Sequence, residues 1–265
     1  MKPVYIDAIA ISTPGLDTWE TARKVLKGEL IFEAAPIERY KPKLLPANER
    51  RRATDLIRLA FKVSEEVIGD NLSEDQKLAS VFASSGGDYQ ILDQTSKALA
   101  LPGRIVSPTQ FHNSVHNSAA GYWGIATGSR EASTSISAFD YSFFAGLIEA
   151  ATQVGHSAKS IQLTAYDTSP PEPLQKKRPI LVSFACAFIL SPEATDASIA
   201  KLDLRLNHDA SSETAMREPK LEILRKANPA ARSLPILEAI ANQRSELVHI
   251  KGMGSQILSI EITAC

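Results

Sequence analysis

Segments with the pattern of strands alternate with segments of helical spacing along this 265-residue chain. Strands or strongly apolar runs are predicted at residues 4–12, 78–83, 132–138, 161–166, 180–190, 199–206, 247–250 and 257–263. Helices are predicted at residues 18–27, from residue 46 onward, and at 88–101, 114–127, 141–154, 220–226 and 230–244. Strands separated by such helices form a sheet with helices packed on it, so the chain is predicted to be α/β.

Two of the predicted helices indicate how these layers pack. In the long helix that starts at residue 46, Ile57, Phe61 and Ile68 fall on one face. Residues 114–127 are dense in serine, alanine and glycine. Because small side chains allow backbones to approach closely, we expect the 114–127 helix to lie at the centre of the fold.

Residues 135–140, Ser-Ile-Ser-Ala-Phe-Asp, predict a strand that runs into a sharp turn, and a helix follows from Tyr141. This elbow places the side chain of Asp140 over the mouth of a pocket. A helix N-terminus follows directly, so Asp140 is interpreted as its cap, accepting from the N–H groups of Ser142 and Phe143. A role of Asp140 as an acid, base or nucleophile is the alternative.

The elbow resembles the nucleophile elbow of β-ketoacyl synthases of the thiolase superfamily, whose pattern there is roughly Ser-Ile-x-x-Ala-Cys. Other short matches agree with that family in order and spacing, and they are Ser107-Pro108, Asn117, Ala120, Gly121 and Gly128. The resemblance covers about residues 3–206. It implies a thiolase-like, layered α/β/α fold.

Two departures from the family decide what the resemblance implies. Asp140 stands where the family has its cysteine, and the second-half histidine motifs, such as Asn-x-His-Gly-Thr, do not occur. Condensation needs a thiolate to carry the acyl chain and imidazoles to stabilise the oxyanion, so no condensing activity is expected. We predict one thiolase-like domain over residues 1–265, in which residues 1–206 resemble the first half and residues 207–265 form an abbreviated, divergent second half.

Superfamily members without the cysteine often act as chain-length factors, and this chain most resembles the short chain-length-factor-like subunits of bacterial aryl polyene clusters. The implied partner is a full-length ketosynthase in a heterodimer, with acyl carrier protein as an indirect partner. The elbow strand, residues 132–138, is expected to pair across the interface. The residues expected at the interface or in the partner's acyl tunnel are Thr109, Gln110, Phe111, His112, Ser135, Ser137 and Phe139, with Gln110 and Phe111 as the tunnel floor or gate.

Two other functions stay open at this point. The first is a stand-alone acyl-thioester enzyme, a decarboxylase, hydrolase or transferase, that uses Asp140. The second is self-association, in which the elbow strand pairs with its own copy to give a homodimer when the chain is isolated.

Composition and charge bear on which other classes of function are expected. A net charge of −1 gives no electrostatic case for binding nucleic acid or an anionic membrane. No apolar run approaches the roughly 20 residues of a membrane helix, and the first ten residues do not form a signal peptide. Two cysteines make no disulfide framework, so the cytoplasm is the expected location. No cofactor is expected.

Three polar motifs have a structural and a functional interpretation. His112 and His116 have a spacing that binds metal on a helix, but no third ligand accompanies them, and no metal is expected. The turn at residues 84–88 either cradles a phosphate or is a structural turn. The basic residues 176–178 either form a solvated loop or meet an acidic carrier protein.

Overall fold

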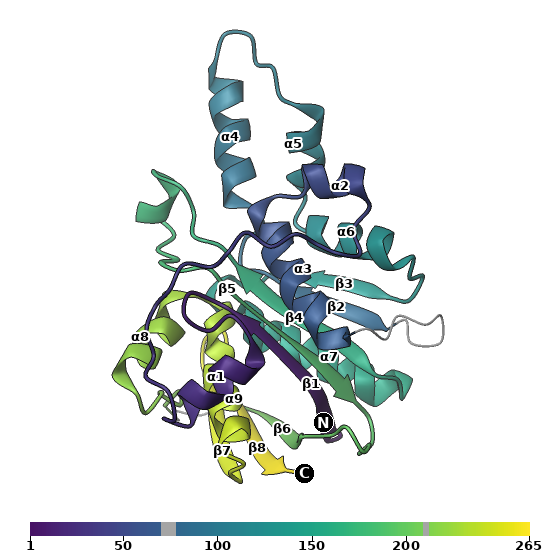
Figure 1. The fold of residues 1–265 in the computed structure, drawn as a ribbon, viewed down its shortest axis with the longest axis vertical. Helices are drawn as coiled ribbons and strands as arrows, with labels where there is room; N and C mark the ends of the chain where they lie inside the picture. The colour runs from purple at the N-terminus through teal and green to yellow at the C-terminus, as the bar shows by residue number, and fades with distance from the viewer. Residues whose placement is uncertain (70–77, 209–211) are drawn as a thin grey trace.

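An eight-stranded mixed sheet runs through the computed structural model, which describes residues 1–69, 78–208 and 212–265 (Figure 1). The strands are β1 (Val4–Ser12), β2 (Ala79–Ala83), β3 (Ser133–Ile136), β4 (Ile161–Asp167), β5 (Phe184–Ser191), β6 (Ala200–His208), β7 (Glu246–Lys251) and β8 (Gln256–Ala264). Their order across the sheet is β3-β2-β4-β5-β1-β6-β8-β7. Strand β2 is parallel to β3 and β4, and the other neighbours are antiparallel.

Helices cover both faces of the sheet (Figure 1). The α-helices are α1 (Trp19–Leu26), α2 (Ala47–Arg52), α3 (Asp55–Ile68), α4 (Tyr89–Ala100), α5 (Pro108–Asn113), α6 (Ser118–Thr127), α7 (Ser142–Ser157), α8 (Pro219–Ala227) and α9 (Leu234–Ala241). Short 3-10 helices are η2 (Phe139–Tyr141), η3 (Leu174–Lys176) and η4 (Ala230–Ser233). The predicted α/β class and the layered arrangement are confirmed.

The alternation of side chains along the strands divides the interior into two cores. In β5, Phe184 and Phe188 pack into the core that contains α7 and α9, whereas Ala185 and Ala187 pack into the core that contains α3 and α6. Successive strand residues point to opposite faces, so a continuous apolar strand is covered on both sides.

Helix α7 lies very close to β2 because of one glycine. A Cβ atom on Gly146 would lie 2.7 Å from the Cβ atom of Ala83, closer than packed carbon atoms approach. This close contact fixes the start of α7, and therefore the elbow, over the carboxyl ends of β2 and β4.

The long helix predicted from residue 46 is two helices. Ala53 is extended between α2 and α3, and the Oγ1 atom of Thr54 caps α3 by accepting from the N–H of Ile57 at 3.3 Å. The Arg58 side chain holds the break in place by donating to the carbonyl oxygens of Ala53 and Arg50. The apolar face starting at Ile57 belongs to α3 as predicted.

The predictions for residues 107–127 were wrong in two respects. The segment after Ser107 forms α5, which has Pro108 in its first turn, and α6 starts only at Ser118. Helix α6 is not central. It buries Tyr122 and Trp123, the latter against Phe61, but a Cβ on Gly121 would meet no atom within 4 Å. Its small residues therefore partly line an open face.

The last three strands continue the same sheet. The boundary predicted at residue 206 lies inside β6, which pairs with β8 along its length. Over residues 1–69, 78–208 and 212–265, none of the helices has the length and hydropathy to span a bilayer.

Candidate functional site at the elbow

The predicted elbow is present between β3 and α7. Phe139 has a φ of +55°, a left-handed conformation that is strained for a bulky residue, and 57% of its surface is exposed. Ser142 holds the turn closed, because its Oγ atom accepts from the N–H of Ala138 at 3.0 Å and donates to the carbonyl of Phe139 at 2.7 Å. The backbone of an elbow is therefore retained, with Phe139 in the left-handed position and the carboxylate of Asp140 directly after it.

Asp140 does not cap α7, so that prediction was wrong. Its Oδ1 atom instead lies 2.5 Å from the Nη1 atom of Arg178, in an ion pair whose arginine side chain is 10% exposed and whose aspartate side chain is 44% exposed. No side chain caps the start of α7, where Tyr141 occupies the cap position. A charge-assisted bond to a largely buried guanidinium is stronger than a cap bond at an exposed turn.

Arg178 is held by three groups at once. Besides Asp140, its Nε atom donates to the hydroxyl of Tyr89 at 3.3 Å, and its guanidinium lies 3.8 Å from the centre of the Phe139 ring. Burial disfavours the charge, yet the bonds and charges of Asp140 and Tyr89 raise the pKa of Arg178. The interpretation of residues 176–178 as a solvated basic loop is therefore wrong for Arg178.

Behind the elbow, a buried carboxylate ends β4. The Oδ1 atom of Asp167 accepts from Ser84 Oγ at 3.0 Å, from Ser85 N at 2.8 Å and from Ser85 Oγ at 2.8 Å. Burial raises the pKa of Asp167 to about 6, against the lowering effect of these serine bonds. The donors of the 84–88 turn thus serve this carboxylate, and the turn is structural and not a phosphate cradle.

The same turn joins several elements. Ser137, one of the predicted interface residues, donates through Oγ to the carbonyl of Ser85 at 3.0 Å, and a ring nitrogen of His116 lies 2.9 Å from the carbonyl oxygen of Ser84. His112 lies on α5 and packs edge-on against Tyr122, so the two histidines do not share a helix. Among the described residues no set of three metal-ligating side chains is gathered.

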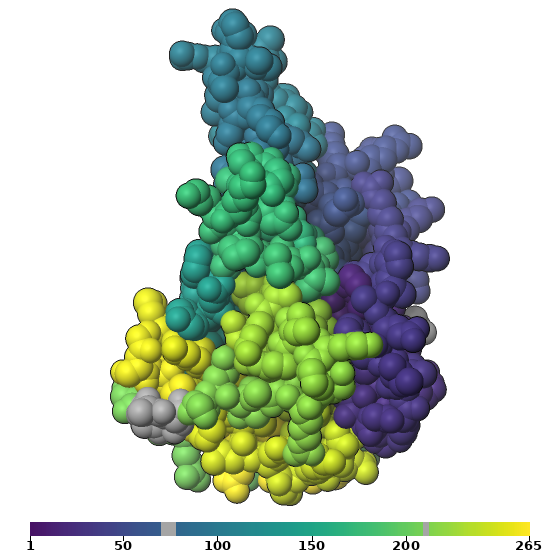
Figure 2. Space-filling view, turned by 90° about the vertical axis from the view of Figure 1, so that its left-hand side faces the viewer, coloured from purple at the N-terminus to yellow at the C-terminus, as the bar shows by residue number. Residues whose placement is uncertain are grey.

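The predicted tunnel residues Thr109, Gln110, Phe111 and His112 all lie on α5. Helices α4 and α5 with their connection form a lobe, residues 89–113, that projects from the rest of the molecule in both views (Figures 1 and 2). Gln110 Nε2 donates to Gln94 Oε1 at 2.8 Å and so ties the two helices together, while the side chain of Phe111 is 69% exposed. Ser135 lies apart from them, in β3.

Sequence reasoning missed Tyr89 and Asp167, and it considered Arg178 only as part of a basic loop. The position of Asp167 could have been predicted, because it ends an apolar strand. That strand runs parallel to the strand before the 84–88 turn, and parallel strands bring their carboxyl ends together. The burial of Arg178 could not have been predicted, since nothing distinguishes it in the sequence from an exposed basic residue of a polar loop.

A cavity of about 170 Å³ lies beside the elbow. Its walls are formed by Phe139, Asp140, Arg178, Pro179, Ile180, Lys226, Ala227, Pro229 and Arg232. This wall contains no cysteine and no histidine. Cys186 is buried in the sheet, where burial raises the pKa of its thiol to about 12. The elbow cavity therefore offers cations and one paired carboxylate, with no thiolate or imidazole.

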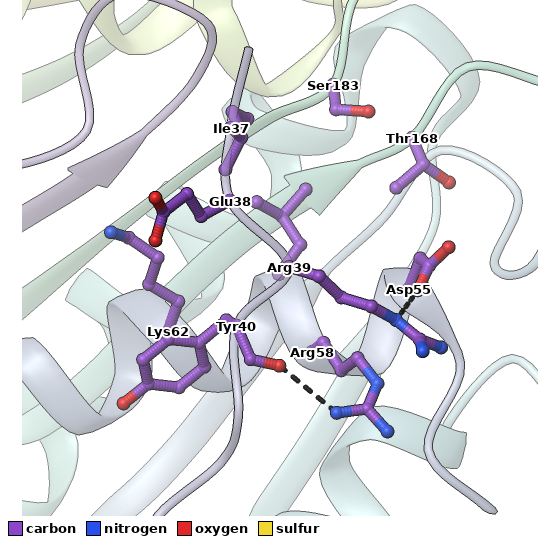
Figure 3. A pocket seen from close by; sticks show the side chains of 10 residues that line it. Ile37, Glu38, Arg39, Tyr40, Asp55, Arg58, Lys62, Thr168 and Ser183 are labelled. Carbon is purple, nitrogen blue, oxygen red and sulfur yellow. Dashed lines mark hydrogen bonds and ion pairs between the residues drawn. The ribbon is translucent and has the colours of Figure 1, made fainter.

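A second cavity, of about 250 Å³, lies on the α3 face and does not include Asp140 (Figure 3). Figure 3 shows Arg39 directed at Asp55, with Nε 3.0 Å from Oδ1, and Arg58 donating to the carbonyl of Tyr40 at 3.1 Å. Lys62 pairs with Asp17 at 2.7 Å. Because these cations already have partners, this cavity is a poor receptor for an anionic group.

The sequence matches the family profile "Beta-ketoacyl synthase, N-terminal domain" over residues 19–253. The chain belongs to the β-ketoacyl synthase N-terminal domain family. The suspected relationship to β-ketoacyl synthases is thereby confirmed. No curated protein was similar enough in sequence to count as a match.

Solved structures of this family share the fold. A chain of the ketosynthase ApeO in complex with its chain length factor ApeC, from Xenorhabdus doucetiae, is 22% identical with a TM-score of 0.73, over 97% of this chain and 98% of that chain. A chain of AntDE:AntF, a type II PKS acyl-carrier protein in complex with its ketosynthase bound to the hexaketide, is 12% identical with a TM-score of 0.76, over 100% and 99%.

The fit to a ketosynthase from a larger synthase is less complete. Ketosynthase twelve from the bacillaene polyketide synthase of Bacillus amyloliquefaciens is 13% identical with a TM-score of 0.57, and the match covers 83% of this chain but only 48% of that chain. The chain is therefore ketosynthase-like and as short as the chains it matches in the two complexes.

Proposed function

We propose that this chain is a non-catalytic, chain-length-factor-like partner of a ketosynthase in aryl polyene, polyketide or fatty-acid-type chain elongation. The observation that carries the proposal is the pairing of Asp140 with Arg178 at the corner of the elbow. A carboxylate in that position cannot hold a growing chain as a thioester, and here its charge is already neutralised by a side chain of the same molecule.

The length of the chain supports the same role. It matches chains in a ketosynthase–chain length factor complex and a ketosynthase–carrier protein complex from end to end, and it spans about half of the bacillaene ketosynthase. We infer that a second chain supplies the catalytic residues. We infer that the other chain is a full-length ketosynthase, that the two form a heterodimer, and that acyl carrier protein is an indirect partner, which delivers the growing acyl chain to the ketosynthase.

The exposed apolar side chains of the lobe support an interface there. Large apolar patches on the surface of a monomer mark sites of interaction with a partner, whereas single exposed hydrophobic residues are ordinary. The large apolar side chains exposed on the lobe are Leu92, Leu99, Leu101, Ile105 and Phe111, of which Ile105 is 84% exposed. Strand β3 adds an edge with no neighbour on its outer side within the described sheet.

The first test is co-expression with a ketosynthase encoded beside this chain, followed by purification of the complex and assay with malonyl-loaded carrier protein. The proposal expects a stable complex and chain elongation that needs both subunits. Turnover of acyl or malonyl thioesters by the isolated chain, or an acyl group trapped covalently on it, would instead support the stand-alone acyl-thioester enzyme. A stable homodimer that does not bind the ketosynthase would support self-association.

The second test concerns the gate. Phe111→Ala or Gln110→Ala in the reconstituted pair should lengthen the product, because one or two methylenes of lost volume change discrimination by about 1–3 kcal/mol, or roughly 10- to 200-fold. Ile223→Ala serves as a matched control, since Ile223 is 67% exposed on α8, away from the lobe. The product distribution, read by mass spectrometry, should shift for the α5 variants alone. An unchanged product distribution for both α5 variants would show that these residues do not line the tunnel.

A further inference from the structure

Few contacts with the rest of the molecule fix the orientation of the lobe. Helix α4 buries only Ile91 and Asp93 among its described side chains, and the lobe extends well beyond the sheet (Figures 1 and 2). Its α5 end is anchored by Asn113, whose Nδ2 atom donates to the carbonyl of Arg52 at 2.9 Å and whose Oδ1 atom accepts from Tyr122 at 3.0 Å. The pose of α4 therefore depends on contacts at its first residues.

Tyr89, the first residue of α4, makes such a contact. Its ring lies over Gly86, where a Cβ atom would overlap the Tyr89 hydroxyl, and this hydroxyl accepts from Arg178 Nε. Arg178 in turn pairs with Asp140. A chain of contacts thus runs from the corner of the elbow through one guanidinium to the base of the lobe.

The guanidinium depends on Asp140 to stay in this position. Its Nη2 atom is buried and has no hydrogen-bond partner, and the buried Oδ2 atom of Asp167 also has none. Burial raises the pKa of Asp167, and the charge of Arg178 is among the influences that lower it. If the Asp140 carboxylate is lost, the buried cation gains by turning toward Asp167, because an unpaired buried charge is costly, and its bond to Tyr89 is then broken.

We propose that Asp140 is a positioning residue that sets the angle of the α4–α5 lobe through Arg178 and Tyr89, and thereby the depth to which Phe111 enters a partner's tunnel. The part about the tunnel rests on the proposed function, whereas the part about the lobe does not. The residue that replaced the nucleophile would then contribute to the choice of product length without touching the substrate.

The lobe is tested first in the isolated chain by hydrogen–deuterium exchange. Asp140→Asn and Tyr89→Phe keep the shape of each side chain and each break one link, so each should speed exchange of the α4 amides about tenfold, as expected for loss of one hydrogen bond. The double variant should exchange no faster than the faster single variant, because both act on one chain of contacts. Asp140→Glu should restore slow exchange.

Tyr40→Phe is the control for loss of a tyrosine hydroxyl, since the Tyr40 hydroxyl bonds to Glu65 outside the lobe at 2.5 Å. It should leave exchange of α4 unchanged. Unchanged α4 exchange in both Asp140→Asn and Tyr89→Phe, or additive effects in the double variant, would overturn the proposal whatever the partner does.

The same variants are then assayed with the ketosynthase. Asp140→Asn and Tyr89→Phe should shift the product distribution in the same direction, with complex yield and total turnover within about twofold of the wild-type pair. An equal loss of all products would show a merely structural role and overturn the positioning role. Failure of the wild-type chain to bind a ketosynthase would instead refute the proposed function, while the exchange result would still stand on its own.

Discussion

At the scale of single residues, the proposed function has Asp140 standing in place of a thiol, and that exchange would change what the elbow can do. A thiolate forms a thioester that survives until the next condensation, whereas an acyl-aspartate anhydride hydrolyses readily, and a fixed negative charge repels a developing enolate. The Asp140 carboxylate is stable at the elbow because Arg178 lies 2.5 Å away and supplies the opposite charge. Burial raises the pKa of Asp167 nearby in the fold, and the charge of the same arginine acts against that rise.

Asp167 should make the stability of the protein depend on pH. Its pKa of about 6 in the fold lies above the usual 3.8, so protonated Asp167 favours folding, and this contribution is complete below pH 3.8 and is lost as pH rises through 6. Asp167→Asn keeps an acceptor for the serine donors and cannot ionise. We therefore expect the variant to gain stability relative to wild type between pH 4 and 7, by on the order of 2 kcal/mol.

Thermal or urea unfolding of both proteins at a series of pH values measures this difference. Parallel stability curves for wild type and variant would contradict the raised pKa of Asp167. A variant that falls further behind wild type as the pH rises would contradict the sign.

At the scale of elements, the position of the elbow depends on the contact of α7 with β2. Gly146 permits this contact, and its replacement by alanine would place a methyl group 2.7 Å from Ala83. We expect Gly146→Ala to destabilise the protein by about 1–3 kcal/mol through overpacking, although alanine is the better helix former. Unfolding in urea measures the loss.

Gly155 provides the control in the same helix. A Cβ atom there would lie 3.9 Å from Lys2, an ordinary contact, so Gly155→Ala should stabilise by roughly 0.5–1 kcal/mol. Equal effects of the two substitutions would show that helix propensity, and not the α7–β2 contact, determines the result.

At the scale of the whole molecule, the free edge of β3 is where a second sheet would join. The carbonyl oxygens of Ala132 and Ile136 accept from the backbone N–H groups of Ser80, in β2, and of Ser84, directly after it. The backbone groups of the even-numbered residues of β3 therefore point toward β2. Because ladder groups alternate along a strand, Ser135 directs its N–H and C=O away from β2. The predicted pairing of this strand across a subunit interface would use those groups.

Ser135→Pro should therefore weaken the complex and leave the fold of the isolated chain nearly intact, since proline is tolerated where the N–H faces outward on an edge strand. Thr134→Pro is the matched control, because it removes an N–H that faces β2 and should lower the stability of the chain itself. Association measured by analytical ultracentrifugation, together with the melting temperature, separates the two effects. Undiminished association of Ser135→Pro would place the interface elsewhere.

Local patterns in the sequence determined most of the elements. Apolar runs and apolar alternation indicated most of the strands, and β3 was predicted as part of the elbow. Helical patterns indicated α1, α3, α4 and α7, because burial of one face is a property of neighbouring residues. The break at Ala53 was missed because the Arg58 side chain holds it by bonds to backbone carbonyls, and such bonds leave no mark on the apolar spacing. The open face of α6 was missed because small residues suit both a close contact and an exposed surface.

For the elbow, the sequence by itself determined the turn, since Asp140 follows a strand and precedes a helix. Only the tertiary structure decided what Asp140 does. Its partner Arg178 lies 38 residues further along the chain, and Tyr89 lies 89 residues from that arginine. Which distant charges meet depends on the order of strands in the sheet and on the paths of the loops between them. An ion pair between distant residues produces no repeating pattern in either sequence segment, so the sequence does not reveal it.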